Sequence, residues 1–398
     1  MTDTTFPTRR RPLWPVFIAP GLVLIGAIAW SAFWFYAASQ VDVVADAWRA
    51  REAKSGRVYD CARRSVAGFP FRLEIRCDGV TVQLVSQTAG QPPAAPVTAK
   101  LGEILAVAQV YDPKLVIAEF TAPAQIFEHG AQEPSFVVNW SKGRSSIVGL
   151  PAIPQRGDIA FDDATIERLD GTMQVPLASA RHIELHGRIA QGSAKDHPDI
   201  ETALQINQGS IQGLHPLMAQ PFDAGIRAMV TGLKDFAPKP WPQRFREIQA
   251  AGGHIEIMQS RVQQGDLIAV SAGTLSLNPD GKLDGELQMT VTGLEHVIPA
   301  LGLEKMLEDG VPQATLDRVA PGVKTQDLNN LFGALDRAIP GLGKVVKQNA
   351  NAGLAAGINA LGKEAELEGK KARAFPLRFV DGAVFFGPLK VGDVPPLF

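Results

Sequence analysis

Three side chains capable of metal binding or acid–base chemistry alternate along one short segment. His182, Glu184 and His186 are separated by Ile183 and Leu185, so on a β-strand all three would project from one face. Two imidazoles and a carboxylate can bind zinc. The spacing differs from the helical His-Glu-x-x-His of metalloproteases, however, and no further ligand is evident. A polar strand face explains the same alternation, and we favour it over a metal-dependent enzyme.

Other catalytic motifs are missing or incomplete. Neither the Gly-x-Ser-x-Gly nucleophile elbow nor the Gly-x-x-x-x-Gly-Lys-[Ser/Thr] phosphate loop occurs. The run Gly341-Leu342-Gly343-Lys344 lacks the phosphate-loop spacing, and a helix break explains it. Asp162-Asp163 and Asp280 could act as acids or calcium ligands, but turn chemistry explains them as well. We therefore assign no catalytic residue, no metal ligand and no cofactor.

The cysteines predict a disulfide. Cys61 and Cys77 are the only two, and they flank a Gly68-Phe69-Pro70 turn. If the chain folds back about Phe69, the two positions face each other across a hairpin, within the roughly 4–5.5 Å Cβ separation that a bridge requires. The alternative is two unrelated buried thiols. A redox-catalytic role lacks the usual Cys-x-x-Cys pair. A disulfide agrees with export to an oxidising compartment.

The charge balance excludes nucleic acid as the expected partner. The chain has 398 residues with 39 Lys+Arg against 41 Asp+Glu, a formal net charge of -2, and 45% hydrophobic residues. A nucleic-acid-binding protein would show a basic excess, and a disordered chain would have fewer apolar residues. The composition therefore indicates a folded chain that binds no nucleic acid.

An uncharged apolar stretch near the N-terminus predicts a membrane segment. Residues 12–41 contain no Asp, Glu, Lys or Arg. Pro15 and Pro20 argue against one continuous helix from the start of the stretch, but Pro20 suits a first helical turn. A helix over residues 21–40 would rise about 30 Å, which matches one bilayer core. We therefore predict a transmembrane anchor at residues 12–40.

The flanks of this anchor predict its orientation. Arg9, Arg10 and Arg11 precede it, so the positive-inside rule places residues 1–11 in the cytoplasm and residues 41–398 outside. Aromatic side chains that prefer the headgroup boundary lie near its ends: Trp14, Trp34 and Tyr36. A signal peptide cleaved before Gln40 is the alternative. The apolar stretch exceeds the usual h-region of about 7–15 residues, so we favour an uncleaved anchor.

The segment after the anchor predicts a short helix and then an antiparallel sheet. The helix is expected over residues 43–55. Apolar and charged residues alternate strictly over residues 71–77, and the alternation continues on the opposite parity over residues 80–84, with a bulge or turn at Asp78-Gly79. A loop is expected over residues 86–99. Further strands are predicted at residues 101–109, 114–120, 135–141, 158–162, 172–175, 181–189 and 199–207. Regular βα alternation is missing, which favours a meander or sandwich.

The second half predicts helices and two hairpins. A helix over residues 241–251 is followed by Gly252-Gly253, a helix stop. Asn278-Pro279-Asp280-Gly281 joins strands over residues 265–277 and 282–293, and pairing Leu277 with Leu283 gathers apolar side chains on one face. Helices at residues 294–309 and 326–368 are expected to cover the sheet or to line a lipid groove. A last hairpin joins residues 375–380 and 383–390 through Asp381-Gly382.

Several of these features together resemble an uncharacterised bacterial family, domain of unknown function twenty-one twenty-five. They are the anchor, Tyr59-Asp60-Cys61, the hairpin from Gly68 to Cys77, Gly252-Gly253, the run from Gly273 to Asn278 with Asp280-Gly281 and Gly285, and Asp381-Gly382 with Gly387-Pro388-Leu389. The resemblance implies a periplasmic protein anchored in the bacterial inner membrane and brings no catalytic residues. An anchor followed by long amphipathic strands is also similar to the AsmA-like envelope proteins, whose curved sheets have an apolar inner face suited to lipid tails.

We therefore expect an α+β, mainly β fold. A single transmembrane helix would precede a long, curved, largely antiparallel sheet with helices packed on one face. The periplasmic domain would span residues 41–398, with subdomains at residues 41–215 and 240–398. The expected partners are the bilayer, through residues 12–40, and a lipid or amphiphile bound in envelope maintenance. The alternative is a scaffold that binds other envelope proteins. We expect no enzymatic activity.

Overall fold

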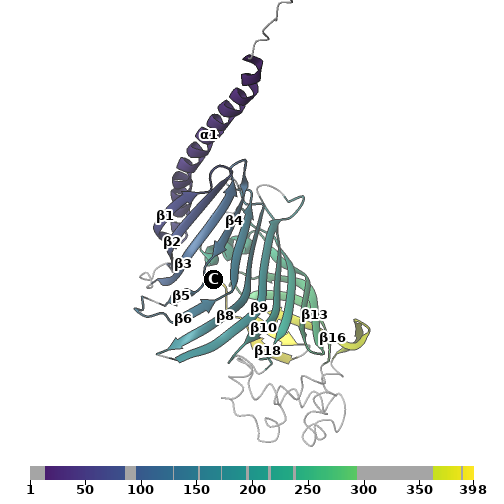
Figure 1. Ribbon diagram of the computed structural model, residues 1–398. Helices are drawn as coiled ribbons and strands as arrows, with labels where there is room; N and C mark the ends of the chain where they lie inside the picture. Colours follow the sequence, from purple (N-terminus) through teal and green to yellow (C-terminus); the bar gives the residue numbers. More distant parts are fainter. Residues whose placement is uncertain are drawn as a thin grey trace, which may run out of the picture.

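The structure is a computed structural model, and its described residues form a long helix followed by one sheet. These residues are 14–85, 96–128, 130–150, 153–171, 173–193, 197–213, 217–235, 239–293, 362–386 and 389–398. Helix α1 (Trp14–Ala53) comes first, helix α2 (Trp241–Ala250) lies between strands, and the strands join in an 18-stranded sheet. The predicted mainly β fold is confirmed (Figure 1).

Every strand pairing in the described residues is antiparallel. The strands are β1 (Arg57–Ala67), β2 (Arg72–Leu84), β3 (Val97–Gln109), β4 (Asp112–Phe120), β5 (Ala124–Phe127), β6 (Phe136–Asn139), β7 (Lys142–Val148), β8 (Arg156–Asp170), β9 (Met173–Ile189), β10 (Ile200–Ile211), β11 (Phe222–Val230), β12 (His254–Gln264), β13 (Leu267–Leu277), β14 (Leu283–Thr292), β15 (Lys363–Leu367), β16 (Lys370–Val380), β17 (Ala383–Phe386) and β18 (Leu389–Asp393). From β8 to β14 each strand pairs with the next in the chain. β14 then pairs with β16, whose other side holds β15 and β17.

Beyond β3 the sheet divides into two branches, which rejoin at β8. β3 pairs with β4 along one half and with β5 along the other. β4 leads to β7, β5 leads to β6, and both branches meet at β8. The hydrogen-bonded ladder is therefore continuous from β1 to β18.

The two faces of the sheet differ in chemistry. Ile159, Leu185, Leu204 and Ile226 are register partners in one row across β8 to β11, so they share a face. The adjacent row places Asp158 opposite His186 on the other face. Since successive side chains of a strand alternate, the first face is apolar and the second polar.

Both helices lie on the apolar face, which is concave. Figure 1 shows the sheet curving around, with α2 on its inner side. The buried Ile248 of α2 lines a hollow together with Val230, Ile255 and Leu275 of the sheet. α1 and α2 thus lie on one face of the curved sheet, whereas the helices that the sequence predicts to cover it, at residues 294–309 and 326–361, lie outside the described residues.

The C-terminal half of α1 packs on the sheet, and its N-terminal half projects beyond the sheet edge (Figure 1). Trp34 and Val41 are buried against Leu73 and Val110. The Trp34 indole N–H donates to the Arg72 carbonyl at 2.8 Å. Trp34 is only 5% exposed, so its ring packs within the protein, and its predicted position at a headgroup boundary stays a prediction.

The predicted separation of the N-terminal region into two helices is also wrong. One helix, Trp14–Ala53, replaces the expected helices at residues 21–40 and 43–55 and contains Pro20. An interior proline removes one backbone donor and crowds the carbonyl four residues earlier, and the helix continues through Pro20 despite this cost. From Gly26 to Gly56 neither Gly nor Pro interrupts the chain, so contacts with the sheet extend the helix beyond the apolar stretch.

Several other predicted bounds need correction. Residues 363–367 form strand β15 and are not helical, because their backbone pairs with β16. The remainder of the predicted helices, at residues 294–309 and 326–361, lies outside the described residues. The predicted strand 383–390 is two strands, β17 and β18, which pair with each other. The predicted strands 172–175 and 181–189 belong to the single strand β9, and residues 97–99 belong to β3. β2 runs through the expected bulge, with Gly79 at a φ of 62°.

Three strands had no sequence prediction: β5, β7 and β11. β7 shows why, because Lys142, Arg144, Ser145 and Ser146 leave little apolar alternation in its sequence. β4 and β8 flank it and supply its hydrogen bonds. The ladder around such a strand determines its structure, and its own residues do so only weakly.

The β13–β14 hairpin confirms the predicted register. Leu277 pairs with Leu283, and Gly273 pairs with Leu287. Gly273 has a φ of 152°, and a Cβ there would clash with the backbone oxygen of Glu286. The close approach of the two strands therefore requires glycine at this position.

We expect Gly273→Ala to destabilise the fold by about 1–3 kcal/mol, because the added methyl group must displace backbone atoms. Gly225→Ala is the matched control, since a Cβ at Gly225 meets nothing within 4 Å. The measurement is the urea midpoint of unfolding for both variants. Equal midpoints would contradict the packing argument.

Candidate functional site

The polar residues singled out in the sequence form a chain of contacts on the convex face. Nδ1 of His182 lies 2.6 Å from Oδ1 of Asp162, and Nδ1 of His186 lies 2.6 Å from Oδ1 of Asp158. The two oxygens of Glu184 lie 3.3 Å from Nε2 of His182 and 3.2 Å from Nε2 of His186. The prediction that the three residues share one face is confirmed.

The contacts between these histidines and carboxylates shift their pKa values. The hydrogen bond to Asp162 raises the pKa of His182, burial opposes the rise, and Glu184 adds to it. The same contact lowers the pKa of Asp162. Burial raises the pKa of Asp158, but the hydrogen bonds from His186 and Ser146 outweigh it and leave that pKa lowered.

The arrangement suits a polar strand face better than a metal site. Both oxygens of Glu184 point to different imidazoles, and the outer ring nitrogens are engaged by aspartates. Across the residues that the structure describes, no group of three or more His, Cys, Asp or Glu side chains is placed to hold a metal ion. Glu184 and His186 also line an outward-facing hollow of about 740 Å³ with charged neighbours including Arg144, Arg188 and Glu201.

The concave face contains two apolar hollows. The first has a volume of about 600 Å³ and is lined by, among others, Ile200, Trp241, Phe245, Ile248, Leu275 and Leu283. The second has a volume of about 250 Å³ and is lined by, among others, Val138, Trp140, Phe161, Ile183, Ile206 and Phe222. Volumes of a few hundred Å³ with apolar walls are typical of small-molecule sites.

Strand β10 connects the two hollows. Ile200 lines the first hollow, Ile206 and Ile211 line the second, and Leu204 lies between them. Its register partners Leu185 and Ile226 are 45% and 37% exposed. From Ile200 to Ile211, β10 rises roughly 36 Å. We call the strip of the concave face along β10, from the first hollow to the second, the apolar groove.

Ion pairs neutralise the charges around the first hollow. Lys239 Nζ lies 2.5 Å from Oε2 of Glu247 and 2.8 Å from Oδ2 of Asp235. These hydrogen bonds raise the pKa of Lys239. Burial raises the pKa of Glu247, but its contacts with Lys239 and Arg244 lower it overall. Paired charges let an apolar ligand enter without isolating a buried charge.

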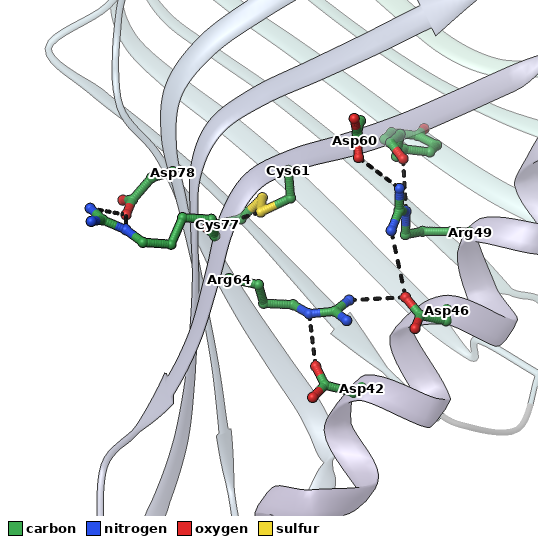
Figure 2. The surroundings of a disulfide bond; sticks show 10 residues. Asp42, Asp46, Arg49, Asp60, Cys61, Arg64, Cys77 and Asp78 are labelled. Atoms are coloured by element: carbon green, nitrogen blue, oxygen red, sulfur yellow. Dashed lines mark hydrogen bonds and ion pairs between the residues drawn. A yellow bond between two sulfur atoms is a disulfide. The ribbon is translucent and has the colours of Figure 1, made fainter.

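Figure 2 shows the disulfide and the ion pairs beside it. Cys61 and Cys77 are bonded with a Cα–Cα distance of 5.6 Å, as predicted. The predicted register is wrong, because Cys61 lies opposite Val80 and Cys77 opposite Arg64. The carbonyl of Gly68 accepts from the amide of Arg72, so the turn is centred nearer Pro70 than Phe69 and the ladder is displaced.

The ion pairs attach α1 to the strand that carries the disulfide. Arg64 lies 2.8 Å from Asp42 and 3.1 Å from Asp46, and Arg49 lies 2.8 Å from Asp60 (Figure 2). The hydrogen bond from Arg64 lowers the pKa of Asp46. Exposed pairs of this kind each contribute about 0–1 kcal/mol. The disulfide therefore has a structural position, in the hairpin against which the helix packs.

A comparison with known protein families matches most of the chain to one of them. Residues 34–395 match the bacterial family described as "Uncharacterized protein conserved in bacteria (DUF2125)". The chain belongs to this family. None of the curated proteins matches the sequence. The DUF2125 region begins at Trp34, where α1 enters the core, and includes the cysteine hairpin and the apolar groove. The similarity to AsmA-like proteins stays a prediction.

The N-terminal helix meets the requirements of a membrane span. Its part from Phe17 to Ala53 is long and apolar enough to cross a bilayer. The groove itself was not predicted at residue level, although Ile183 and Leu185 alternate with the polar residues of β9. Only the pairing of β9 with β10 places Leu185 beside Leu204.

We expect the His182 imidazole to titrate above the ordinary value of about 6.5 and Asp162→Asn to lower its midpoint toward that value. Because the folded pKa is raised, the stability from charged His182 is complete below about pH 6.5 and is lost as pH rises through the folded pKa. Because the folded pKa of Asp162 is lowered, the stability that its charged form contributes is complete above about pH 3.9 and is lost as pH falls through the folded pKa. NMR of the histidine ring resonances measures the midpoint.

Asp163→Asn is the matched control for this titration. The carboxylate of Asp163 accepts a hydrogen bond from the Ser141 hydroxyl, and Asp162 is the aspartate that contacts His182, so the Asp163 variant should leave the midpoint unchanged. A His182 midpoint that Asp162→Asn does not move would contradict the role given to the Asp162 contact.

Proposed function

We propose that this protein is an inner-membrane-anchored periplasmic protein whose concave groove binds a lipid or a similar amphiphile in envelope maintenance. The observation that carries the proposal is the row Leu185, Leu204 and Ile226, which stays accessible between two apolar hollows. An apolar strip inside a curved sheet, with polar side chains directed outward, suits the hydrocarbon tail of an amphiphile.

The hydrophobic effect is sufficient for such binding. Each methylene moved from water into an apolar environment contributes about 0.8 kcal/mol. The groove's reach of roughly 36 Å exceeds the roughly 15 Å depth of one bilayer leaflet, so an extended acyl chain fits along it. The proposal involves displacement of water and no bond-making step.

The packing of α1 supports an uncleaved anchor. A signal peptide cut before Gln40 would remove Trp34, Ala37 and Ala38 from the cluster around Leu73. Loss of a buried tryptophan alone costs about 3–5 kcal/mol in a typical core. The arginines at residues 9–11 support a cytoplasmic N-terminus and hence a periplasmic sheet.

A scaffold function is the second candidate, supported by the charged hollow on the convex face. That hollow combines Arg188 and Arg227 with Glu201, which lies 2.6 and 3.3 Å from them. A mixed-charge concavity suits a protein surface of complementary charge. Crosslinking in membranes separates the two, because a carrier captures lipid and a scaffold captures one reproducible protein.

We expect Leu185→Glu and Ile226→Glu to reduce the lipid that co-purifies with the full-length protein by about tenfold or more, because a carboxylate in the groove must be desolvated against the acyl chain. Mass spectrometry of lipids extracted from the detergent-purified protein measures the amount.

Ile117→Glu is the matched control, since Ile117 is 42% exposed but shares the outer face with Ser146. It should retain lipid at the parent level. Lipid that binds equally to all variants, or to none including the parent protein, would contradict binding in the groove.

A further inference from the structure

We propose that three neighbouring turns contact the outer leaflet of the membrane and insert apolar side chains into its headgroup region. The turns lie at the same end of their strands, along the edge of the sheet from which α1 projects (Figure 1). The turns join β1 to β2, β3 to β4 and β7 to β8, and we call their exposed apolar residues the membrane rim: Phe69, Phe71, Tyr111 and Ile153. The inference rests on the proposed membrane anchor and adds the surface that meets the bilayer.

The first of these turns fixes where the bilayer must end along α1. The Trp30 indole N–H donates to the Pro70 carbonyl at 2.8 Å, and the ring of Trp30 lies 6.2 Å from that of Phe71. One turn of helix further on, the ring of Trp34 lies 5.4 Å from that of Phe69. The sheet therefore begins beside Trp30, well before the predicted end of the span at residue 40.

A sheet with a charged outer face cannot enter the hydrocarbon, so only the helix before Trp30 is available to cross it. From Trp14 to Trp30 the helix rises about 24 Å. A hydrocarbon core is about 30 Å thick. The difference of several ångströms brings the sheet edge into the headgroup region, where a short span is compensated by flanking residues.

The exposed residues at this edge suit that position. Phe69, Phe71, Tyr111 and Ile153 are between 52% and 63% exposed. The strand register places them on one edge, because the start of β2 pairs with the end of β3, and the start of β4 pairs with the end of β7. Aromatic side chains with a polar edge prefer the membrane–water boundary. Figure 1 shows α1 extending past the sheet on this side.

This edge carries charges of both signs. Burial of apolar side chains, and not attraction to charged lipids, would therefore drive its insertion into the headgroup region. Arg72 and Lys114 are exposed there together with Asp112. Opposite charges in one region give little net attraction to anionic lipids. Ile200, at the start of β10, lies toward the same edge, so the membrane rim would place the first apolar hollow close to the outer leaflet.

Photocrosslinking of the full-length protein tests the rim. p-Benzoylphenylalanine replaces Phe71, Tyr111, Leu24 or Met173, one position at a time, in protein reconstituted into vesicles of zwitterionic phosphatidylcholine. Leu24 reports on the anchor itself, and Met173 is the matched control because it is 64% exposed at the opposite edge of the sheet, between β8 and β9. Mass spectrometry counts covalent lipid adducts after irradiation.

The expected result is lipid adduct at positions 24, 71 and 111 and none above background at position 173. Adduct at position 24 with none at positions 71 and 111 would overturn the membrane rim while the anchor stands. Adduct at none of the positions would overturn the anchor and the rim together. Equal adduct at positions 71 and 173 would also overturn the rim, since contact would then be unspecific. Using both positions 71 and 111 protects the test against one variant that fails to fold.

Discussion

The alternation of side chains along an unbroken antiparallel ladder is the constraint on which the rest of this structure depends. Each strand directs neighbouring residues to opposite faces, and a shift of register by one residue would exchange the faces. From β8 to β11 the ladder keeps Leu185, Leu204 and Ile226 in one row. From β8 to β11 the curved sheet therefore has an apolar inner face and a polar outer face, and the groove follows from this order.

The position of the long N-terminal helix also depends on the alternation of side chains in the sheet. Its C-terminal half packs on the apolar face at the first edge of the sheet, where Trp34 and Val41 are buried. Ion pairs from Arg64 and Arg49 hold the polar part of the helix to β1. The helix thus joins two environments, because one half belongs to the folded domain and the other projects from it. The disulfide stands in the hairpin that receives the helix.

The two faces support different functions. The inner face combines apolar hollows with paired charges, and on these features we base the proposal of a hydrocarbon ligand. The outer face carries histidines and carboxylates that contact one another, as His182 contacts Asp162 on the neighbouring strand and Glu184 on its own. The residues with the most reactive side chains therefore stabilise the sheet, while ordinary aliphatic residues form the site that we propose to be functional.

The sequence by itself determined the elements whose signals are local. Hydropathy predicted the apolar helix near the N-terminus. Gly273 and the Asn278 to Gly281 turn predicted the β13–β14 register. Two cysteines in one hairpin predicted their disulfide bond. Tertiary structure alone decided the continuity of α1, the displaced register of β1 and β2, the polar strand β7 and the meeting of Leu185 with Leu204 and Ile226. These features depend on contacts between residues distant in the chain, and periodicity within a single segment carries no record of which strand will lie beside it.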